Sequence, residues 1–183
     1  MQTAIMNYAA ISRHLFLFTL LISCISLGAS AQKCVDQADP ITGERTVEFK
    51  NNQETLRYKY EGGEEVEVYM TFIYADEQNT TMPEGSEVAI KLKDDTVVML
   101  KSAREAMPKT KVTANQYGAT VTTSYTLEFV IDKATTTTLA SDKISFIRYP
   151  ALDGGTIDLD IKGLGKIYAG KITKGAECIS SKF

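Results

Sequence analysis

Tryptophan is absent from this chain of 183 residues, and histidine occurs once, as His14. Histidine-dependent catalytic triads and histidine-ligated metal sites are therefore excluded for any part of the protein that does not contain position 14. The chain also lacks an excess of positive charge, because 20 basic side chains stand against 23 acidic ones, which gives a net charge of −3. Nucleic-acid-binding surfaces usually carry a marked excess of lysine and arginine, so we expect no nucleic-acid partner.

Residues 1–31 are predicted to be an export signal peptide that is removed, leaving a single β-rich domain over residues 32–183. Arg13 supplies a positive charge, and Ala29-Ser30-Ala31 fits the cleavage pattern of small residues. The apolar stretch between them is about 13 residues long, short of the roughly 20 that a membrane-spanning helix needs. The processed chain then contains no histidine, and we expect it to be periplasmic or extracellular.

A second interpretation of the same segment is lipidation at Cys24. Leu21-Ile22-Ser23-Cys24 resembles a bacterial lipobox, in which the cysteine becomes the lipidated first residue. The protein would then be a membrane-anchored lipoprotein, and only in that case do we expect it to contact a membrane. Ala29-Ser30-Ala31 is the better match, and the folded domain is the same in both cases.

Cysteine is scarce, and only Cys34 and Cys178 follow residue 31. An even pair in an oxidising compartment predicts a disulfide, here between the two ends of the domain. By the loop-entropy relation, such a closure stabilises the fold by roughly 5 kcal/mol at most. Two unpaired buried thiols are the alternative, whereas the absence of a Cys-x-x-Cys pair argues against a catalytic dithiol.

Residues with β-branched or aromatic side chains are abundant, and several segments alternate between apolar and polar residues. The alternation is clear over 65–74, 87–93, 124–132 and 156–162, and glycine, asparagine or aspartate separates these segments from their neighbours. Period-2 alternation with one polar face is typical of antiparallel strands. We therefore predict a mainly β fold, an antiparallel sandwich or partly closed barrel of about eight or nine strands, with a short C-terminal helix.

Two short helices are expected beside the strands. One covers about 134–140, although its run of threonines disfavours helix because β-branched side chains lose freedom there. The other lies within 163–177, where apolar residues recur near a spacing of 3.6. Glycines in that segment weaken a helix, so we expect a short helix followed by irregular chain up to Cys178.

Few residues form a pattern that indicates chemistry. Asp153, Asp158 and Asp160 are weak candidates for calcium ligands, because a hard cation needs several converging oxygens; a solvated polar face is the simpler interpretation. Residues 165–171 match part of a phosphate-binding loop, but Ile172 stands where Ser or Thr would bind Mg²⁺. We therefore expect no catalytic residues, no metal, no cofactor and no enzymatic activity.

Three features carry a resemblance to known proteins. Lys33-Cys34 is followed by Asp39-Pro40-Ile41-Thr42-Gly43, Leu139-Ala140-Ser141-Asp142-Lys143-Ile144 leads into Ile147-Arg148-Tyr149, and Cys178 comes late in the chain. In these features the chain resembles small exported β-rich proteins of Gram-negative bacterial envelopes, whose function is unknown. The resemblance implies a periplasmic or surface β-domain that ends in a helix, with no catalytic residues to transfer.

The expected function is that of a non-catalytic exported domain that binds an envelope or extracellular protein or a small ligand. The polar loops over 76–85 and 103–109 are the expected binding positions, since recognition residues favour loops on a rigid scaffold. Two alternatives remain open. One is a carrier of a small apolar ligand in the mouth of a β-barrel, and the other is an envelope assembly component whose edge strands pair with another chain.

Overall fold

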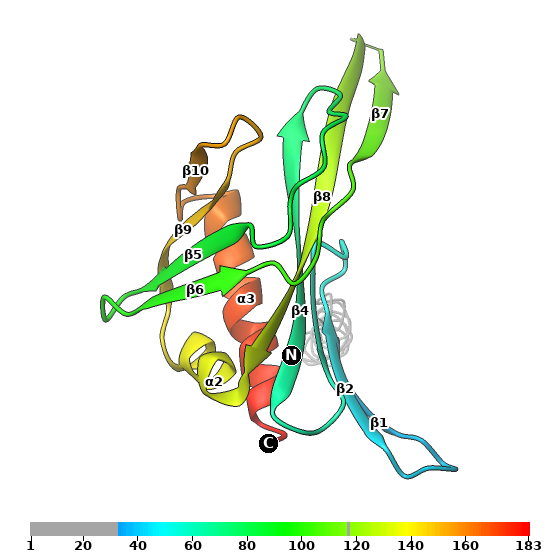
Figure 1. Ribbon diagram of the computed structural model, residues 1–183, viewed down its shortest axis with the longest axis vertical. Coiled ribbons are helices and arrows are strands. Elements are labelled where there is room, and N and C mark those ends of the chain that lie inside the picture. Colours follow the sequence, from blue (N-terminus) through cyan, green and yellow to red (C-terminus); the bar gives the residue numbers. More distant parts are fainter. Residues whose placement is uncertain (1–32, 117) are drawn as a thin grey trace, which may run out of the picture. The chain divides into compact units, whose positions relative to one another are not determined.

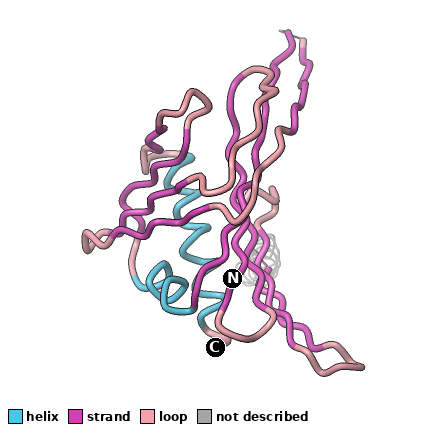
Figure 2. The backbone as a smooth tube through the Cα atoms, in the orientation of Figure 1, coloured by secondary structure: helices cyan, strands magenta, loops and turns pink. Residues whose placement is uncertain are grey.

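The computed structural model describes residues 33–116 and 118–183, which form ten strands and two helices (Figures 1 and 2). The strands are β1 (Lys33–Ala38), β2 (Arg45–Lys50), β3 (Leu56–Tyr60), β4 (Glu65–Ala75), β5 (Glu87–Leu92), β6 (Val97–Lys101), β7 (Lys109–Asn115), β8 (Gly118–Asp132), β9 (Ile144–Pro150) and β10 (Thr156–Leu159). The helices are α2 (Lys133–Ser141) and α3 (Leu164–Ser180). The predicted signal peptide, with Arg13, His14 and Cys24, lies outside the described residues, so its cleavage and lipidation stay predictions.

The strands form two antiparallel sheets, one of which is curved into a half-barrel. The larger sheet has the order β1-β2-β3-β4-β8-β7, and the smaller sheet has the order β10-β9-β5-β6. Every pairing in both sheets is antiparallel. The predicted mainly β fold with a C-terminal helix is confirmed, with ten strands where eight or nine were expected.

Strands β4 and β8 are the two longest strands of the larger sheet, and they are neighbours in it. They pair over eleven residues, from Glu65 opposite Asp132 to Ala75 opposite Thr122. Alternate residues of β4 are buried, as the sequence pattern predicts, and these are Val66, Val68, Met70, Phe72 and Tyr74. The other face of β4 is polar or partly exposed, so the sheet buries one face only.

The two sheets meet where β6 ends. Ser102 forms an isolated antiparallel bridge with Phe129 of β8, and the backbone N–H of Ala103 donates to the Glu128 carbonyl at 2.7 Å. Arg104 then pairs with the Glu128 carboxylate. This short ladder satisfies part of the β8 edge that β7 leaves uncovered, and it fixes the smaller sheet against the larger one.

Helix α2 forms despite its threonine run. Asp132 caps its first turn, because its carboxylate accepts a hydrogen bond from the Thr135 N–H at 2.7 Å. The hydroxyls of Thr136, Thr137 and Thr138 donate to carbonyls four residues earlier, so their polar atoms remain satisfied within the helix.

Helix α3 is longer than the sequence suggests. The expected irregular chain before Cys178 is wrong, because the helix continues unbroken to Ser180. Its glycines are tolerated where packing requires them: a β-carbon at position 175 would lie 2.4 Å from the Tyr58 ring. Neither α2 nor α3, the helices of the described chain, is long and apolar enough to span a bilayer.

A disulfide ties the first strand to the last helix. Cys34 of β1 and Cys178 of α3 are bonded, with 5.8 Å between their Cα atoms, as predicted. Beside it, the Asp36 carboxylate accepts a hydrogen bond from Arg45 Nε at 2.7 Å and pairs with Lys182 Nζ at 3.2 Å. The hydrogen bond from Arg45 is the main cause that lowers the pKa of Asp36. The two ends of the domain are therefore held together covalently and electrostatically.

Candidate ligand-binding site

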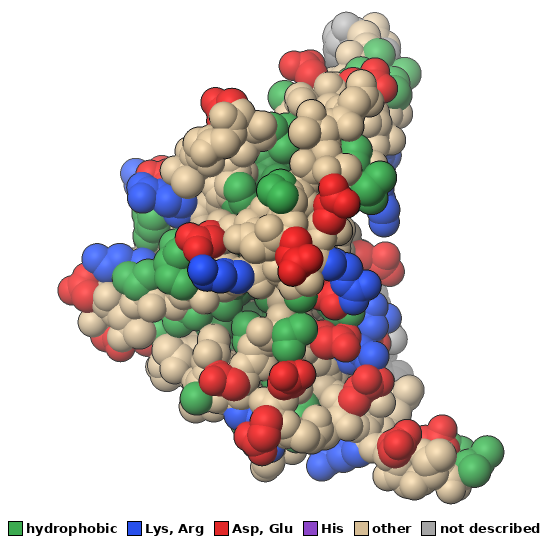
Figure 3. Space-filling view, viewed as in Figure 1, with side chains coloured by type: hydrophobic (Ala, Val, Ile, Leu, Met, Phe, Trp, Pro, Cys, Tyr) green, Lys and Arg blue, Asp and Glu red, His purple; other side chains and the backbone are tan. Residues whose placement is uncertain are grey.

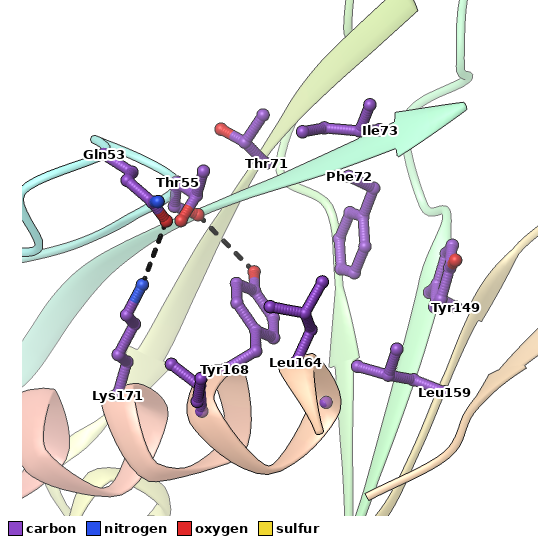
Figure 4. A pocket seen from close by; sticks show the side chains of 12 residues that line it. Gln53, Thr55, Thr71, Phe72, Ile73, Tyr149, Leu159, Leu164, Tyr168 and Lys171 are labelled. Atoms are coloured by element: carbon purple, nitrogen blue, oxygen red, sulfur yellow. Dashed lines mark hydrogen bonds between the residues drawn. The ribbon is translucent and has the colours of Figure 1, made fainter. Parts of the chain in front are cut away.

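A concave, mostly apolar groove of about 420 Å³ lies between the N-terminal half of α3 and strands β4, β9 and β10 (Figure 4). We call it the aromatic groove, and the residues that define it are Phe72, Tyr149, Leu159, Leu164, Ile167 and Tyr168. Cavities of this size and character are typical of small-molecule sites. The aromatic groove is therefore the first candidate for a functional site.

Three aromatic rings from three separate elements form the wall of the groove. Phe72 of β4 stacks on Tyr149 of β9, with 4.6 Å between ring centroids and an interplanar angle of 18°. Tyr168 of α3 meets Phe72 edge-on at 6.3 Å. The hydroxyl of Tyr74 donates to the Pro150 carbonyl at 2.6 Å, which holds β9 beside β4. These contacts fix the positions of the three rings within the fold.

The start of α3 places aliphatic side chains at the rim. Gly165 lies so close to the turn after β10 that a β-carbon there would be 1.9 Å from the Asp160 carbonyl oxygen. With this glycine turned inward, its neighbours on the helix face outward: Leu164 is 83% exposed and Ile167 is 56% exposed. Ile73 of β4 adds a third exposed aliphatic residue to the lining. Such a concentration of exposed apolar surface usually marks an interaction site.

One end of the groove is polar. Lys171 Nζ donates to Gln53 Oε1 at 3.2 Å, and the Tyr168 hydroxyl points at the Thr55 carbonyl at 3.5 Å (Figure 4). Burial raises the pKa of both Tyr168 and Tyr149, so both phenols are neutral at ordinary pH. The described lining contains no carboxylate, thiol or imidazole. The groove thus offers apolar contact, ring stacking and one ammonium group.

The three aspartates considered for calcium each have a partner of their own. Asp158 forms a two-pronged ion pair with Arg148, at 2.6 and 2.9 Å, and the hydrogen bond from Arg148 lowers the pKa of Asp158. Asp153 accepts a backbone N–H within its own turn, and Asp160 pairs with Lys162 at 3.5 Å. Over residues 33–116 and 118–183, no three acidic, histidine or cysteine side chains are grouped to hold a metal ion.

The other segments considered from the sequence lie apart from the groove or change their meaning. Residues 165–171 are helical and form no phosphate-binding loop. The loops over 76–85 and 103–109 are joined by a bridge between Met82 and Ala106, both buried. Neither loop lines the aromatic groove, so the expected binding positions are not where the concavity lies.

The aromatic wall could not be predicted from the sequence. The sequence pattern places Phe72 in a strand and Tyr168 in a helix, and nothing in it shows that their rings meet. On the face shown in Figure 3, acidic and basic side chains are interspersed rather than separated by sign.

No protein-family model, curated protein or solved structure matches the chain. Its function must therefore be argued from its own geometry.

Proposed function

We propose that this protein is a non-catalytic exported domain that holds a small apolar ligand in the aromatic groove. The observation that carries the proposal is the exposure of Leu164 and Ile167 beside a preformed cavity of about 420 Å³ with a stacked aromatic wall. A volume in this range suits a small molecule, and the concave shape favours such a ligand over a flat protein surface. The proposed site is the groove between α3 and strands β4, β9 and β10.

The affinity available from this groove is substantial. Fully burying one leucine or isoleucine side chain contributes about 1.5–3 kcal/mol. A ligand that covers the exposed parts of Leu164 and Ile167, 83% and 56% of these residues, therefore gains about 2–4 kcal/mol from them, in addition to contact with the rings. That contribution corresponds to roughly a hundredfold in Kd.

The disulfide supports the proposal that the domain works outside the cytoplasm. Disulfides such as that between Cys34 and Cys178 persist in oxidising compartments. Together with the predicted signal peptide over residues 1–31, this favours a periplasmic or extracellular protein. Lipidation at Cys24 would anchor the same domain to a membrane and leave the groove unchanged.

Titration with N-phenyl-1-naphthylamine, a neutral apolar fluorophore, tests the proposal. The protein contains no tryptophan, so probe emission is read without that background. We expect the double variant Leu164→Gln/Ile167→Gln to bind the probe about a hundredfold more weakly than the unmodified protein, because both substitutions remove apolar rim surface.

A matched control separates the groove from general surface hydrophobicity. Val97→Gln/Val112→Gln makes the same kind of change at two residues that are 54% and 63% exposed and lie outside the groove. We expect this variant to bind the probe as the unmodified protein does. Equal affinities of the two double variants, or no binding to the unmodified protein, would contradict the proposal.

A further inference from the structure

A second groove, of about 570 Å³, borders another face of α3. We call it the lysine groove, and it is defined by Lys93, Lys143, Lys166 and Lys174 around the apolar residues Ile144, Ile161 and Ala169. Glu177 is the single carboxylate in its described lining. The groove therefore combines an apolar floor with four positive charges and one negative charge.

The lysines are brought together by regular structure. Lys166, Gly170, Lys174 and Glu177 are spaced three or four residues apart in α3, so they share one face of the helix. Lys93 follows β5 and Lys143 precedes β9, and the Lys93 N–H donates to the Lys143 carbonyl at 2.9 Å. Two lysines whose backbones are joined by this hydrogen bond and two lysines of α3 thus line the same groove.

None of the four ammonium groups forms an ion pair within the part of the chain that the structure describes. Twelve ion pairs occur among the described residues, and none of them involves Lys93, Lys143, Lys166 or Lys174. Composition does not explain the cluster, because the chain as a whole carries a net charge of −3. Like charges gathered in one concavity create a positive potential that attracts an anion.

We infer that the lysine groove binds an anionic amphiphile, a single molecule with a negatively charged headgroup and an apolar chain. The ammonium groups at the rim match the headgroup, since lysine binds phosphate or carboxylate as a point charge. Ile161, which is partly exposed, and the aliphatic stems of the lysines provide the surface for the chain, above Ile144 and Ala169, which are buried. A free inorganic anion would leave this floor uncovered, and a neutral apolar ligand would leave the lysines without a partner.

Calorimetric titration with dodecyl phosphate, kept below its micelle concentration at low salt, tests the inference. We expect it to bind at least tenfold more tightly than inorganic phosphate, which has the charge alone, or dodecanol, which has the chain alone. Added salt is expected to weaken binding, because the charge contacts are exposed and therefore screened.

Matched variants identify the groove as the site. Lys143→Gln/Lys174→Gln is expected to weaken binding of dodecyl phosphate about tenfold, since an exposed charge contact contributes a factor of roughly two to five. Lys109→Gln/Lys111→Gln makes the same change in net charge on β7, outside both grooves, and is expected to have no more than a twofold effect.

Glu177→Gln provides a test of opposite sign that a folding defect cannot imitate. Removal of the groove's carboxylate is expected to tighten binding of dodecyl phosphate about two- to threefold. Equal losses in the two lysine variants, or weaker binding of Glu177→Gln, would overturn the inference. So would binding of inorganic phosphate or dodecanol as tight as that of dodecyl phosphate, or binding to anionic vesicles alone.

The two grooves can be told apart because they use different faces of α3. The Leu164→Gln/Ile167→Gln variant is expected to keep its affinity for dodecyl phosphate while it loses the neutral probe. If that variant loses dodecyl phosphate as well, the amphiphile occupies the aromatic groove, and the assignment of the lysine groove is wrong.

Discussion

Replacement of Gly175 by alanine is predicted to destabilise the protein, even though alanine is the better helix former. Gly175 lies where α3 crosses the larger sheet, and it is buried. A β-carbon there would be 2.4 Å from Tyr58 Cδ2, 2.5 Å from Tyr58 Cε2 and 3.0 Å from Phe49 Cδ1. Both rings are buried and pack edge to face, so neither has room to move away.

The expected magnitude follows from two opposing effects. An extra methyl group in a well-packed core costs about 1–3 kcal/mol, sometimes more. Alanine in place of glycine within a helix returns up to about 1 kcal/mol. At a separation of 2.4 Å the overpacking cost lies at its upper end, so Gly175→Ala should lose about 2 kcal/mol. For a domain of this size that loss lowers the Tm by about 4–8 °C.

Gly170 provides a control within the same helix. A β-carbon at Gly170 meets no atom within 4 Å, and Gly170 is exposed. Gly170→Ala should therefore stabilise the protein by about 0.5–1 kcal/mol. Thermal and urea unfolding of both variants, followed by circular dichroism, measure the two effects. If Gly175→Ala is neutral or stabilising, helix α3 does not pack on Tyr58 as described, and the reasoning is refuted.

Three further predictions concern a buried hydroxyl, the disulfide and pH. Tyr58→Phe should not destabilise the protein, because the buried Tyr58 hydroxyl has no hydrogen-bond partner in the described chain. Tyr125→Phe should lower the free energy of unfolding by about 1 kcal/mol, because it removes the hydrogen bond to the Thr80 carbonyl. Urea unfolding in which Tyr58→Phe is the less stable of the two variants would contradict this prediction. Replacing both disulfide cysteines by serine should lower the free energy of unfolding by up to about 5 kcal/mol, since the bond spans 144 residues; a loss below about 1 kcal/mol would show that it does not constrain the unfolded chain. The free energy of unfolding should be flat between about pH 5 and 8, because no histidine follows residue 31. It should fall below about pH 4, since the lowered pKa of Asp36 gives stabilisation that is present above the unfolded value of 3.8 and lost on protonation. In chemical denaturation, a slope between about pH 5 and 8 would contradict the first expectation, and a constant free energy of unfolding below about pH 4 would contradict the role of Asp36.

Strands could be predicted from the sequence because their pattern is local. Val66, Val68 and Met70 are buried for the same reason that they alternate with polar residues: one face of β4 covers the core. The pairing of β4 with β8 joins segments far apart in the chain, and no spacing rule reveals it.

The extent of α3 could not be predicted, because it depends on contacts with distant residues. Its glycines count against a helix when only local preference is considered. In the structure, Gly175 gives the helix its close approach to Tyr58, and Gly165 gives it room beside the Asp160 carbonyl. The cost in helix preference is offset by packing that only the folded chain provides.

The aromatic groove was hidden for a similar reason. Its wall joins Phe72, Tyr149 and Tyr168, which belong to three elements and meet only when α3 lies against the sheets. One signal was present in the sequence. Leu164 and Ile167 are apolar, but they lie outside the set of α3 residues that pack in the core. An apolar face wider than its core contact indicates surface left for another molecule.

The most direct test of the proposed function is to map the bound probe on the protein by nuclear magnetic resonance. Amide and side-chain shifts would be recorded while N-phenyl-1-naphthylamine is added to the isotope-labelled protein. We predict the largest changes at Phe72, Tyr149, Tyr168 and the first turns of α3, with the β7–β8 hairpin unaffected. Changes concentrated away from these residues, or no saturable change at all, would contradict the assignment of the aromatic groove as a ligand site.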